Sequence, residues 1–347
     1  MLFLRFAPLV LVPAAIALEM IHAPAALIFV VCAAAIIPLA HLMGIGTEEL
    51  AARTGPTIGG LMNATLGNAA ELIIGIFALR AGLIELVKAS LTGSIIGNLL
   101  LILGLSLLAG GLKHRTQSFN RQAAGMNVAL LTLAVVGLVV PALFDFTHPA
   151  GDFATQERLS IFVAVMLLGV YLLSLLFSLK THRKLFRPEG EQEPPTWPAR
   201  RAIITLVVAT ALVAWLSEIL VGVTEETIAE LGVSELFIGI IIIPIVGNAA
   251  EHGAAVMMAV KNKMDLSFAI AVGSSTQVAL FVAPLMVFLS LALGNPMNLA
   301  FTAFEVTAVA LAVGVVTVIS LDGESNWLEG VQLLAVYGIL AAAFFFF

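Results

Sequence analysis

A short polar string occurs twice in this chain, each time inside a long apolar stretch. Residues 67–71 and 247–251 both read Gly-Asn-Ala-Ala-Glu, 180 residues apart. A charged acid at the centre of a membrane helix is unfavourable by roughly 2.5 to 3.5 kcal/mol on insertion scales. Glu71 and Glu251 must therefore be protonated, bound to a cation or in contact with water. Switching between the first two conditions amounts to proton-coupled cation exchange.

Further oxygen ligands accompany these acids. Each string places an asparagine three residues before its glutamate, on the same helical face. The next apolar segment of each half adds a polar stripe behind a glycine, and these hydroxyl and amide oxygens suit calcium or a similar cation. Each Ser, Asn or Gln taken alone could instead form an interhelical hydrogen bond. The predicted metal ligands are Glu71, Glu251, Asn68, Asn248, Ser94, Ser274, Gln277 and Asn98.

His252 follows the second glutamate directly. It titrates near neutrality in an ordinary setting, which makes it a candidate for proton binding together with Glu71 and Glu251. The alternative for a lone helix histidine is a hydrogen-bonding neighbour of the site.

A second acidic motif repeats less closely, with an offset of 177 residues. One interpretation is an entrance that concentrates cations at each membrane face, and the other is a helix cap or a solvated turn. Glu218 and Glu305 also lie within apolar spans but have no acidic counterpart at the repeat offset, so they receive no role. The candidate entrance acids are Glu48 and Glu49 in the first half and Glu225 and Glu226 in the second.

Composition decides the class of protein that must position these residues. Of the 347 residues, 61% are hydrophobic and 11% are charged, whereas a soluble domain has about 25% charged residues. We predict an all-α membrane protein with eleven transmembrane helices, because eleven apolar stretches are long enough to cross roughly 30 Å of hydrocarbon. The lone Cys32 can form neither a disulfide nor a thiolate zinc site. The predicted spans cover residues 2–18, 23–43, 56–79, 83–110, 122–140, 158–179, 201–221, 236–260, 266–292, 298–320 and 327–346.

The positive charges predict the orientation. With this helix count, thirteen of the sixteen Lys and Arg residues fall on the side of the N-terminus. That side is therefore expected in the cytoplasm, and the C-terminus outside.

The 180-residue offset predicts the domain organisation. It relates two sets of five helices, and because five is odd the second set must enter the membrane from the opposite side. We expect a first transmembrane helix (1–20), an N-terminal repeat (21–180), a polar cytoplasmic linker (181–200) that carries the acidic run Glu189 to Glu193, and an inverted C-terminal repeat (201–347). Transporters built this way place their substrate site near the midplane, where helices of each repeat are broken. The residues expected to make those breaks are Gly59, Gly60, Asn63 and Gly67 in the first half and Gly239, Pro244 and Gly247 in the second.

Several strings together resemble the cation/proton exchanger branch of the calcium/cation antiporter superfamily. The resemblance covers nearly the whole chain and implies exchange of calcium, or a similar divalent cation, for protons by alternating access. It implies that Glu71 and Glu251 form the cation and proton site. Sodium-exchanging relatives have a Ser-Ala-Pro-Glu type string in the first repeat and more usually Asp in the second. The resembling strings are 67–74 (GNAAELII), 93–100 (GSIIGNLL), 247–256 (GNAAEHGAAV), 273–284 (GSSTQVALFVAP) and 322–340 (DGESNWLEGVQLLAVYGIL).

Other functions stay open with less support. A sodium- or potassium-coupled exchanger and a passive cation channel could use similar polar stripes. An intramembrane metalloenzyme would need a His-Glu-x-x-His helix, which Glu251-His252 does not provide, so we expect no enzyme activity. The expected partners are calcium, protons and the lipid bilayer, with no nucleic acid and no cofactor beyond the transported ions. We place the protein in the inner (plasma) membrane of a prokaryote, and a homo-oligomer is allowed.

Overall fold

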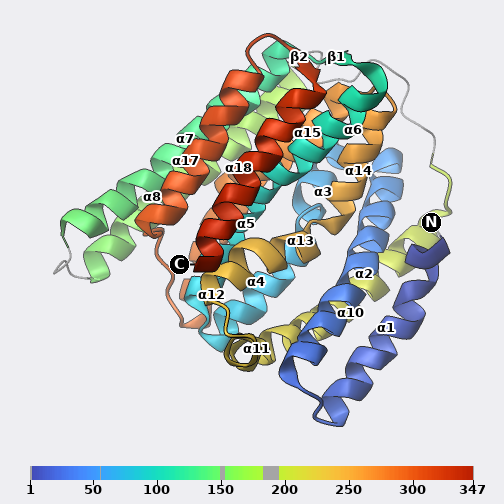
Figure 1. The fold of residues 1–347 in the computed structure, drawn as a ribbon, viewed down its shortest axis with the longest axis vertical. Coiled ribbons are helices and arrows are strands. Elements are labelled where there is room, and N and C mark those ends of the chain that lie inside the picture. Colours follow the sequence, from blue (N-terminus) through green and yellow to red (C-terminus); the bar gives the residue numbers. More distant parts are fainter. Residues whose placement is uncertain (1, 55, 149–152, 183–194, 347) are drawn as a thin grey trace. The chain divides into compact units, whose positions relative to one another are not determined.

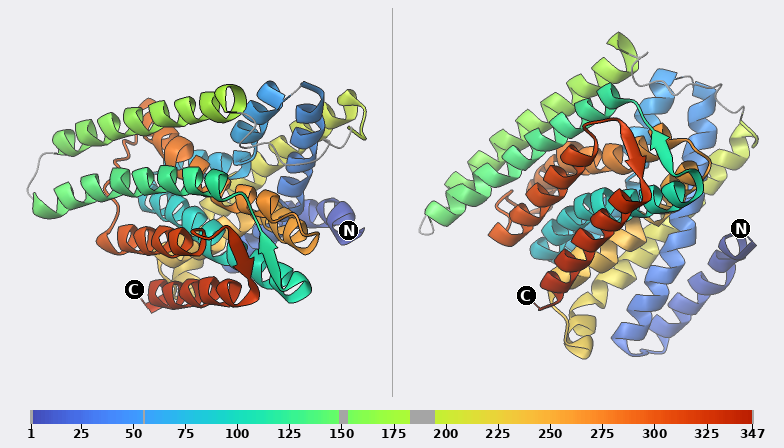
Figure 2. Two further views of the ribbon diagram at one scale, coloured as in Figure 1. Left: turned by 90° about the horizontal axis from the view of Figure 1, so that it is seen from above. Right: turned by 45° about the horizontal axis from the view of Figure 1, so that its top comes forward.

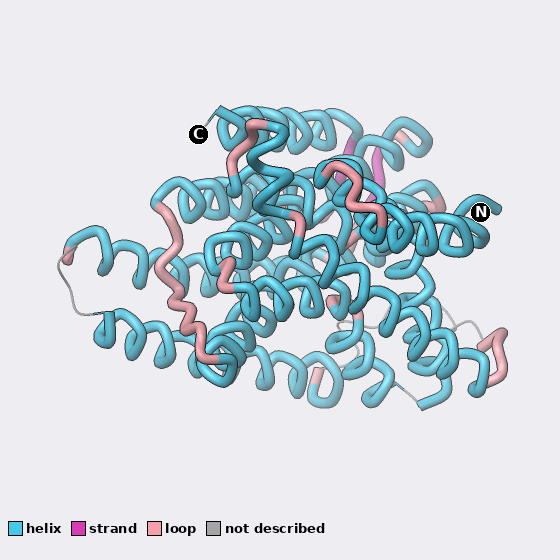
Figure 3. Tube along the Cα trace, turned by 90° about the horizontal axis from the view of Figure 1, so that it is seen from below, coloured by secondary structure: helices cyan, strands magenta, loops and turns pink. Residues whose placement is uncertain are grey.

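The computed structural model describes residues 2–54, 56–148, 153–182 and 195–346. Helices make up nearly all of them (Figure 3), which confirms the predicted all-α class. Within these ranges one small antiparallel sheet occurs, in which β1 (Thr116–Ser118) pairs with β2 (Glu324–Asn326). Residues 183–194 of the predicted linker, with the acidic run Glu189 to Glu193, lie outside the described residues.

The chain forms two compact units, and each unit combines two separate segments of sequence. Unit 1 comprises Met1–Val87 with Glu189–Ala250, and unit 2 comprises Lys88–Pro188 with Glu251–Phe347. Each unit thus contains residues from both halves of the chain, and α5 (Ile84–Ile96) and α14 (Ala249–Val260) contribute residues to both units.

In unit 1, the longest helix is α2 (Ala25–Thr54), which lies along α10 and also packs against α1, as Figure 1 shows. Its Gly46 permits the close approach, because a Cβ there would lie 3.2 Å from the carbonyl oxygen of Ala202. Besides its parts of α5 and α14, unit 1 contains α1 (Leu2–Met20), α2 (Ala25–Thr54), α3 (Pro56–Leu66), α4 (Ala69–Ala81), α10 (Ala199–Gly222), α11 (Thr224–Leu231), α12 (Glu235–Phe237), the π-helix η3 (Ile238–Ile242) and α13 (Ile243–Gly247).

In unit 2, α7 and α8 lie side by side in both views of Figure 2, and α6 packs tightly against α18. The tight packing depends on Gly111 and Gly330, where an added Cβ would collide with the backbone of Trp327 and Leu108. Besides the two strands and its parts of α5 and α14, unit 2 contains the π-helix η1 (Gly97–Ile102), α6 (Leu103–His114), α7 (Arg121–Thr147), α8 (Phe153–Leu176), the π-helix η2 (Phe177–Thr181), α15 (Met264–Gln277), the π-helix η4 (Val278–Val282), α16 (Ala283–Leu293), α17 (Ala303–Ile319) and α18 (Trp327–Phe346).

The duplicated sequence folds into duplicated local structure. After α4, Gly82 adopts a left-handed φ of 80°, and after α14 its counterpart Asn262 adopts 59°. Both turns contain the same pair of backbone hydrogen bonds. In the first turn, the N–H groups of Gly82 and Leu83 donate to the carbonyl oxygens of Leu79 and Ala78; in the second, those of Asn262 and Lys263 donate to Ala259 and Met258. The π-helices η1 and η4 likewise recur near the 180-residue offset. This recurrence supports an internal duplication, whereas the inversion of the copies stays a prediction.

The number of spans is supported more coarsely. Seven helical stretches of the described residues are long and apolar enough to cross a membrane, or eight if α11 and α12–α13, bent by 115°, form one broken span. Two shorter apolar helices, Val10–Met20 and Ala303–Ile319, come in addition. The count of eleven therefore remains a prediction.

The predicted end of the second span was wrong. The second span does not end at residue 43 but continues as α2 to Thr54, because Glu48 to Ala52 are good helix formers. The seventh span, predicted over 201–221, agrees with α10, and the separate helix α11 that follows it ends at Leu231 and is capped by Gly232 with a left-handed φ of 64°. The acids at positions 48 and 49 consequently lie within a helix and do not follow it.

Candidate functional site

Both repeated strings are helix breaks, as the sequence predicts. In the first, α3 ends at Leu66 and α4 begins at Ala69, and in the second, α13 ends at Gly247 and α14 begins at Ala249. Each glutamate stands in the first turn of the new helix. The unpaired N–H groups and the dipole of a helix N-terminus favour negative charge there. The breaks therefore provide local support for an ionised acid within an apolar protein.

In unit 1, the glutamate of the first break packs on the glycine of the second. A Cβ added to Gly247 would lie 2.8 Å from Cγ of Glu71, which is closer than real side chains approach. The helices α4 and α13 are in contact here. The amide of Asn248 is buried, and its Nδ2 donates to the carbonyl oxygen of Pro244 at 3.1 Å. Asn68 is also buried. The close approach of Glu71 to Gly247 brings Glu71 and the neighbouring Asn248, both predicted ligands, to the meeting point of α4 and α13.

In unit 2, the two polar stripes meet. Asn98 Nδ2 donates to Ser274 Oγ at 3.2 Å, and both side chains are buried. Ser275 Oγ donates to the carbonyl oxygen of Ile95 at 3.3 Å, which fixes α15 against α5 at the same level. Ser94 is buried one turn from Asn98, while Gln277 is half-buried at the end of α15. The structure thus joins residues from both repeats at one polar contact.

Asn98 has a further acceptor. Its Oδ1 is buried and has no hydrogen-bond partner among the described residues. Buried acceptors are almost always satisfied by protein, water or an ion. Asn98 also stands in the π-helix η1, and such local widening of a helix is frequent at functional sites. This oxygen is therefore available to a cation or a water molecule.

Glu251 and His252 are half-buried at the start of α14. The other end of this helix is held by the end of α6, because Lys113 Nζ and His114 Nε2 lie 3.1 and 2.9 Å from the carbonyl oxygen of Val260, and by β1, where Gln117 Nε2 donates to the carbonyl oxygen of Ala259 at 2.9 Å. Cationic groups suit a helix C-terminus. This support has no signature in the sequence, because the partners lie 146 residues apart and carry no shared motif.

The candidate entrance acids differ in their surroundings. Glu49 accepts hydrogen bonds from the backbone N–H groups of Thr196 and Trp197, at 3.2 and 3.0 Å, and from the Thr196 hydroxyl. It therefore supports the start of α10. Glu48, Glu225 and Glu226 are exposed, and an entrance role for the four acids stays a prediction.

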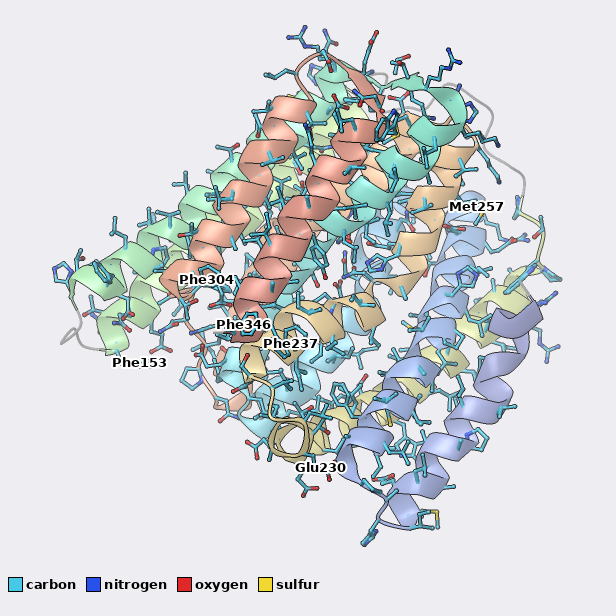
Figure 4. The ribbon with its side chains drawn as sticks, viewed as in Figure 1. Phe153, Glu230, Phe237, Met257, Phe304 and Phe346 are labelled. Atoms are coloured by element: carbon cyan, nitrogen blue, oxygen red, sulfur yellow. The ribbon has the colours of Figure 1, made fainter. Side chains whose placement is uncertain are left out.

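Another acid, Glu230, was not identified from the sequence. It lies on α11 and is labelled in Figure 4. Its Oε1 and Oε2 accept from the N–H groups of Ala25 and Ala26 at 3.1 and 2.9 Å, at the first turn of α2. Glu49 and Glu230 thus make such contacts at opposite ends of α2, Glu49 with the segment before α10 and Glu230 from α11.

Among the described residues, no three His, Cys, Asp or Glu side chains are grouped closely enough to hold a metal ion. The predicted ligands other than Glu71 and Glu251 are amide and hydroxyl oxygens, and the assignment of these residues to a cation site stays a prediction.

Comparison with known proteins identifies the family. The family described as sodium/calcium exchanger protein matches residues 24–180 and 201–346. A Ca(2+)/H(+) antiporter of Synechocystis sp. is 47% identical over 342 residues, covering 92% of this chain and 91% of the relative. The Ca(2+)/H(+) antiporter ChaA of Bacillus subtilis is 47% identical over 340 residues and covers 96% of each chain. The solved structure of native YfkE has a TM-score of 0.86 at 44% identity and covers 97% of each chain. The chain therefore belongs to the sodium/calcium exchanger protein family.

Proposed function

We propose that this protein is a secondary active transporter that exchanges calcium, or a similar divalent cation, for protons. The observation that carries the proposal is the pair of helix breaks, each of which places an asparagine and a glutamate at the start of a new helix. The names of the relatives, which are 47% identical over nearly the full chain, point to the same activity.

The proposed cation site combines the residues at the breaks with the polar stripes. Glu71 and Glu251 provide charge, and hydroxyl and amide oxygens complete the coordination. The contact of Asn98 with Ser274 and the available Oδ1 of Asn98 support this assignment in unit 2. His252 is the proposed additional proton-binding residue. The remaining proposed ligands are Asn68, Asn248, Ser94 and Gln277.

Charge accounting explains the coupling of the two ions. Two carboxylates with one calcium are neutral, and two carboxylic acids are neutral as well, so either loaded site can cross a low-dielectric barrier. The empty site with two ionised acids is strongly disfavoured there, because charge in an apolar medium is costly and the two acids repel each other. Exchange is then obligatory, and calcium affinity falls as the pH falls because protons compete for the same oxygens.

The proposed architecture places this site between two inverted five-helix repeats that follow one extra helix. Transporters of this kind open alternately to the two sides. In the proposed cycle α2 and α10 slide over the neutralised site and close one entrance, with the N-terminus in the cytoplasm and the C-terminus outside. The inner membrane of a prokaryote is the proposed location.

A sodium- or potassium-coupled exchanger is the second candidate, favoured by the description of the matching family. One experiment separates the two. Proteoliposomes are loaded with acid buffer, and external calcium uptake is followed in the absence of sodium and potassium. Uptake that is abolished by a protonophore supports proton exchange, whereas uptake that appears only with a sodium or potassium gradient supports the alternative.

Calorimetry of calcium binding in buffers of different ionisation enthalpy tests the shared site. We expect a release of up to two protons per calcium when the pH lies in the range where the pair is protonated. A release near zero across the whole pH range of binding would contradict competition at one pair of acids.

A further inference from the structure

Unit 2 contains a buried acid outside the proposed cation site. Glu305, in the first turn of α17, is only 1% exposed. Its Oε2 accepts from the N–H and the hydroxyl of Thr302 at 3.0 and 2.8 Å, and the Thr302 hydroxyl in turn accepts from the Glu305 N–H. This reciprocal arrangement is a capping box, which stabilises the start of the helix.

The second carboxylate oxygen of Glu305 does something that a cap does not require. Oε1 accepts from the hydroxyl of Thr92 on α5, at 3.1 Å, and Thr92 is 1% exposed. Glu305 therefore joins two helices that are 213 residues apart in the sequence. Lys88, one turn before Thr92 on the same face of α5, makes a second hydrogen bond from α5 to the segment around the start of α17. Lys88 is 6% exposed, and its Nζ donates to the carbonyl oxygen of Ala300 at 3.0 Å.

These contacts link two positions on one face of α5 to a short stretch of chain, residues 300–305: Lys88 donates to the carbonyl oxygen of Ala300, and Thr92 donates to the carboxylate of Glu305. Buried polar and charged groups are almost always hydrogen-bonded, so both contacts are expected to persist in the folded protein. Lys88 and Thr92 thus attach one face of α5 to the start of α17 and to the segment that precedes it.

The opposite face of α5 leads to the proposed cation site. Ser94 stands two residues after Thr92 and therefore points to nearly the opposite side of the helix. Asn98 follows one turn later and donates to Ser274. The helix is consequently held on one side by α17 and its preceding segment, and on the other side by α15, and α17 also packs against η1, which carries Asn98.

We infer that Glu305 is a positioning residue for cation binding: by holding Thr92 it sets the rotation of α5 and thereby the register of Ser94 and Asn98 with Ser274. The inference rests on the proposed function, because it takes Asn98 and Ser274 as part of the cation site. Glu305 itself has no contact with the cation in this account.

The chain offers a matched control for the capping role. Glu329 stands in the same position of the first turn of α18, where its Oε2 accepts from Asn326 N–H at 3.0 Å and its own N–H donates to Asn326 Oδ1 at 3.3 Å. Glu305→Gln and Glu329→Gln both replace the acid of such a cap. Of these two acids, Glu305 is the one whose carboxylate also accepts a hydrogen bond from Thr92 on α5.

The test measures the calcium dissociation constant of the purified protein by calorimetry, the KM and maximal rate of uptake in proteoliposomes, and the midpoint of thermal unfolding. Glu305→Gln and Thr92→Val should each weaken calcium binding and raise KM about 3- to 30-fold, the range of residues that act through a network. The maximal rate should change far less. Combining the two substitutions should add little, because both remove one contact. Thr92→Ser, which keeps the hydroxyl, should restore the affinity.

Thr92→Val leaves the cap and both charges in place, so it keeps the test decisive if Glu305→Gln does not fold. Wild-type calcium affinity in Thr92→Val, or an equal loss in Glu329→Gln, would overturn the inference. Absence of calcium/proton exchange in the wild-type protein would instead refute the proposed function, so the two failures are distinguishable.

Discussion

The side chain of Glu71 packs directly on the backbone of Gly247, the glycine of the other repeated string. This contact explains why the second string needs glycine at that position, since a Cβ would lie 2.8 Å from Glu71 Cγ. The glycine is thus part of the setting of the acid, in addition to any effect on the helix break.

Gly247→Ala should displace the Glu71 side chain and weaken calcium binding. Overpacking of this kind costs about 1 to 3 kcal/mol, which corresponds to roughly a 5- to 140-fold loss of affinity if it falls on the bound state. Calorimetric titration with calcium measures the loss. Gly253→Ala on α14 is the control, because an added Cβ there meets nothing within 4 Å. Equal affinities in the two variants would argue against a role for the Glu71–Gly247 contact.

The paired acids predict the effect of neutral substitutions. Glu71→Gln and Glu251→Gln should each abolish exchange, because an amide can neither release a proton nor balance the charge of calcium. Both variants should still insert into the membrane and elute as a single species, since Gln keeps the shape of the side chain. Proteoliposome uptake provides the measurement. Glu218→Gln, at an exposed acid of α10, should transport normally, and near-normal transport in either site variant would refute the shared site.

The inverted repeat makes a prediction about two equivalent positions. Ala81 and Lys261 lie 180 residues apart, at the ends of α4 and α14, and both are exposed. Single cysteines at these positions, in a protein with Cys32→Ala, should react with a membrane-impermeant maleimide from opposite sides. Ala81→Cys should react from outside the cell and Lys261→Cys from the cytoplasm. Reaction of both from one side would show that the repeats are parallel.

Glu230 predicts a change in stability. Its two hydrogen bonds to the first turn of α2 resemble those of a helix-capping side chain, whose loss typically costs about 0.5 to 2 kcal/mol. Glu230→Ala should therefore lower the midpoint of thermal unfolding in detergent. The neighbouring Glu226→Ala, at an exposed position of the same helix, controls for helix propensity and net charge. A midpoint that falls equally in both variants would assign the effect to charge alone.

Local features of the chain were predictable because their causes are local. The Gly-Asn pair of each repeated string marks its break, because glycine and asparagine weaken a helix through their own backbone preferences. The other predicted breakers Gly59, Gly60 and Asn63 were wrong, since they lie within α3. The duplication was visible for the same reason, and the turns at Gly82 and Asn262 show it again in the backbone. The end of α2 was missed because Glu48 and Glu49 are charged yet favour the helix, so that charge marked the edge of the apolar run and not the end of the helix.

The sequence by itself determined the membrane class and the repeated breaks, and it predicted the types of candidate ligand, since composition, spacing and residue chemistry are properties of the chain alone. Only the tertiary structure decided that Glu71 lies on Gly247, that Asn98 donates to Ser274 and that Glu305 holds Thr92. These contacts join residues 176 or more positions apart. Such pairs leave no periodic signal in the sequence, because their approach depends on how whole helices pack and rotate against one another. Glu305 shows the difference most clearly: it was noticed as an acid within a span, but its partner is a threonine that no acidic repeat pattern could reveal.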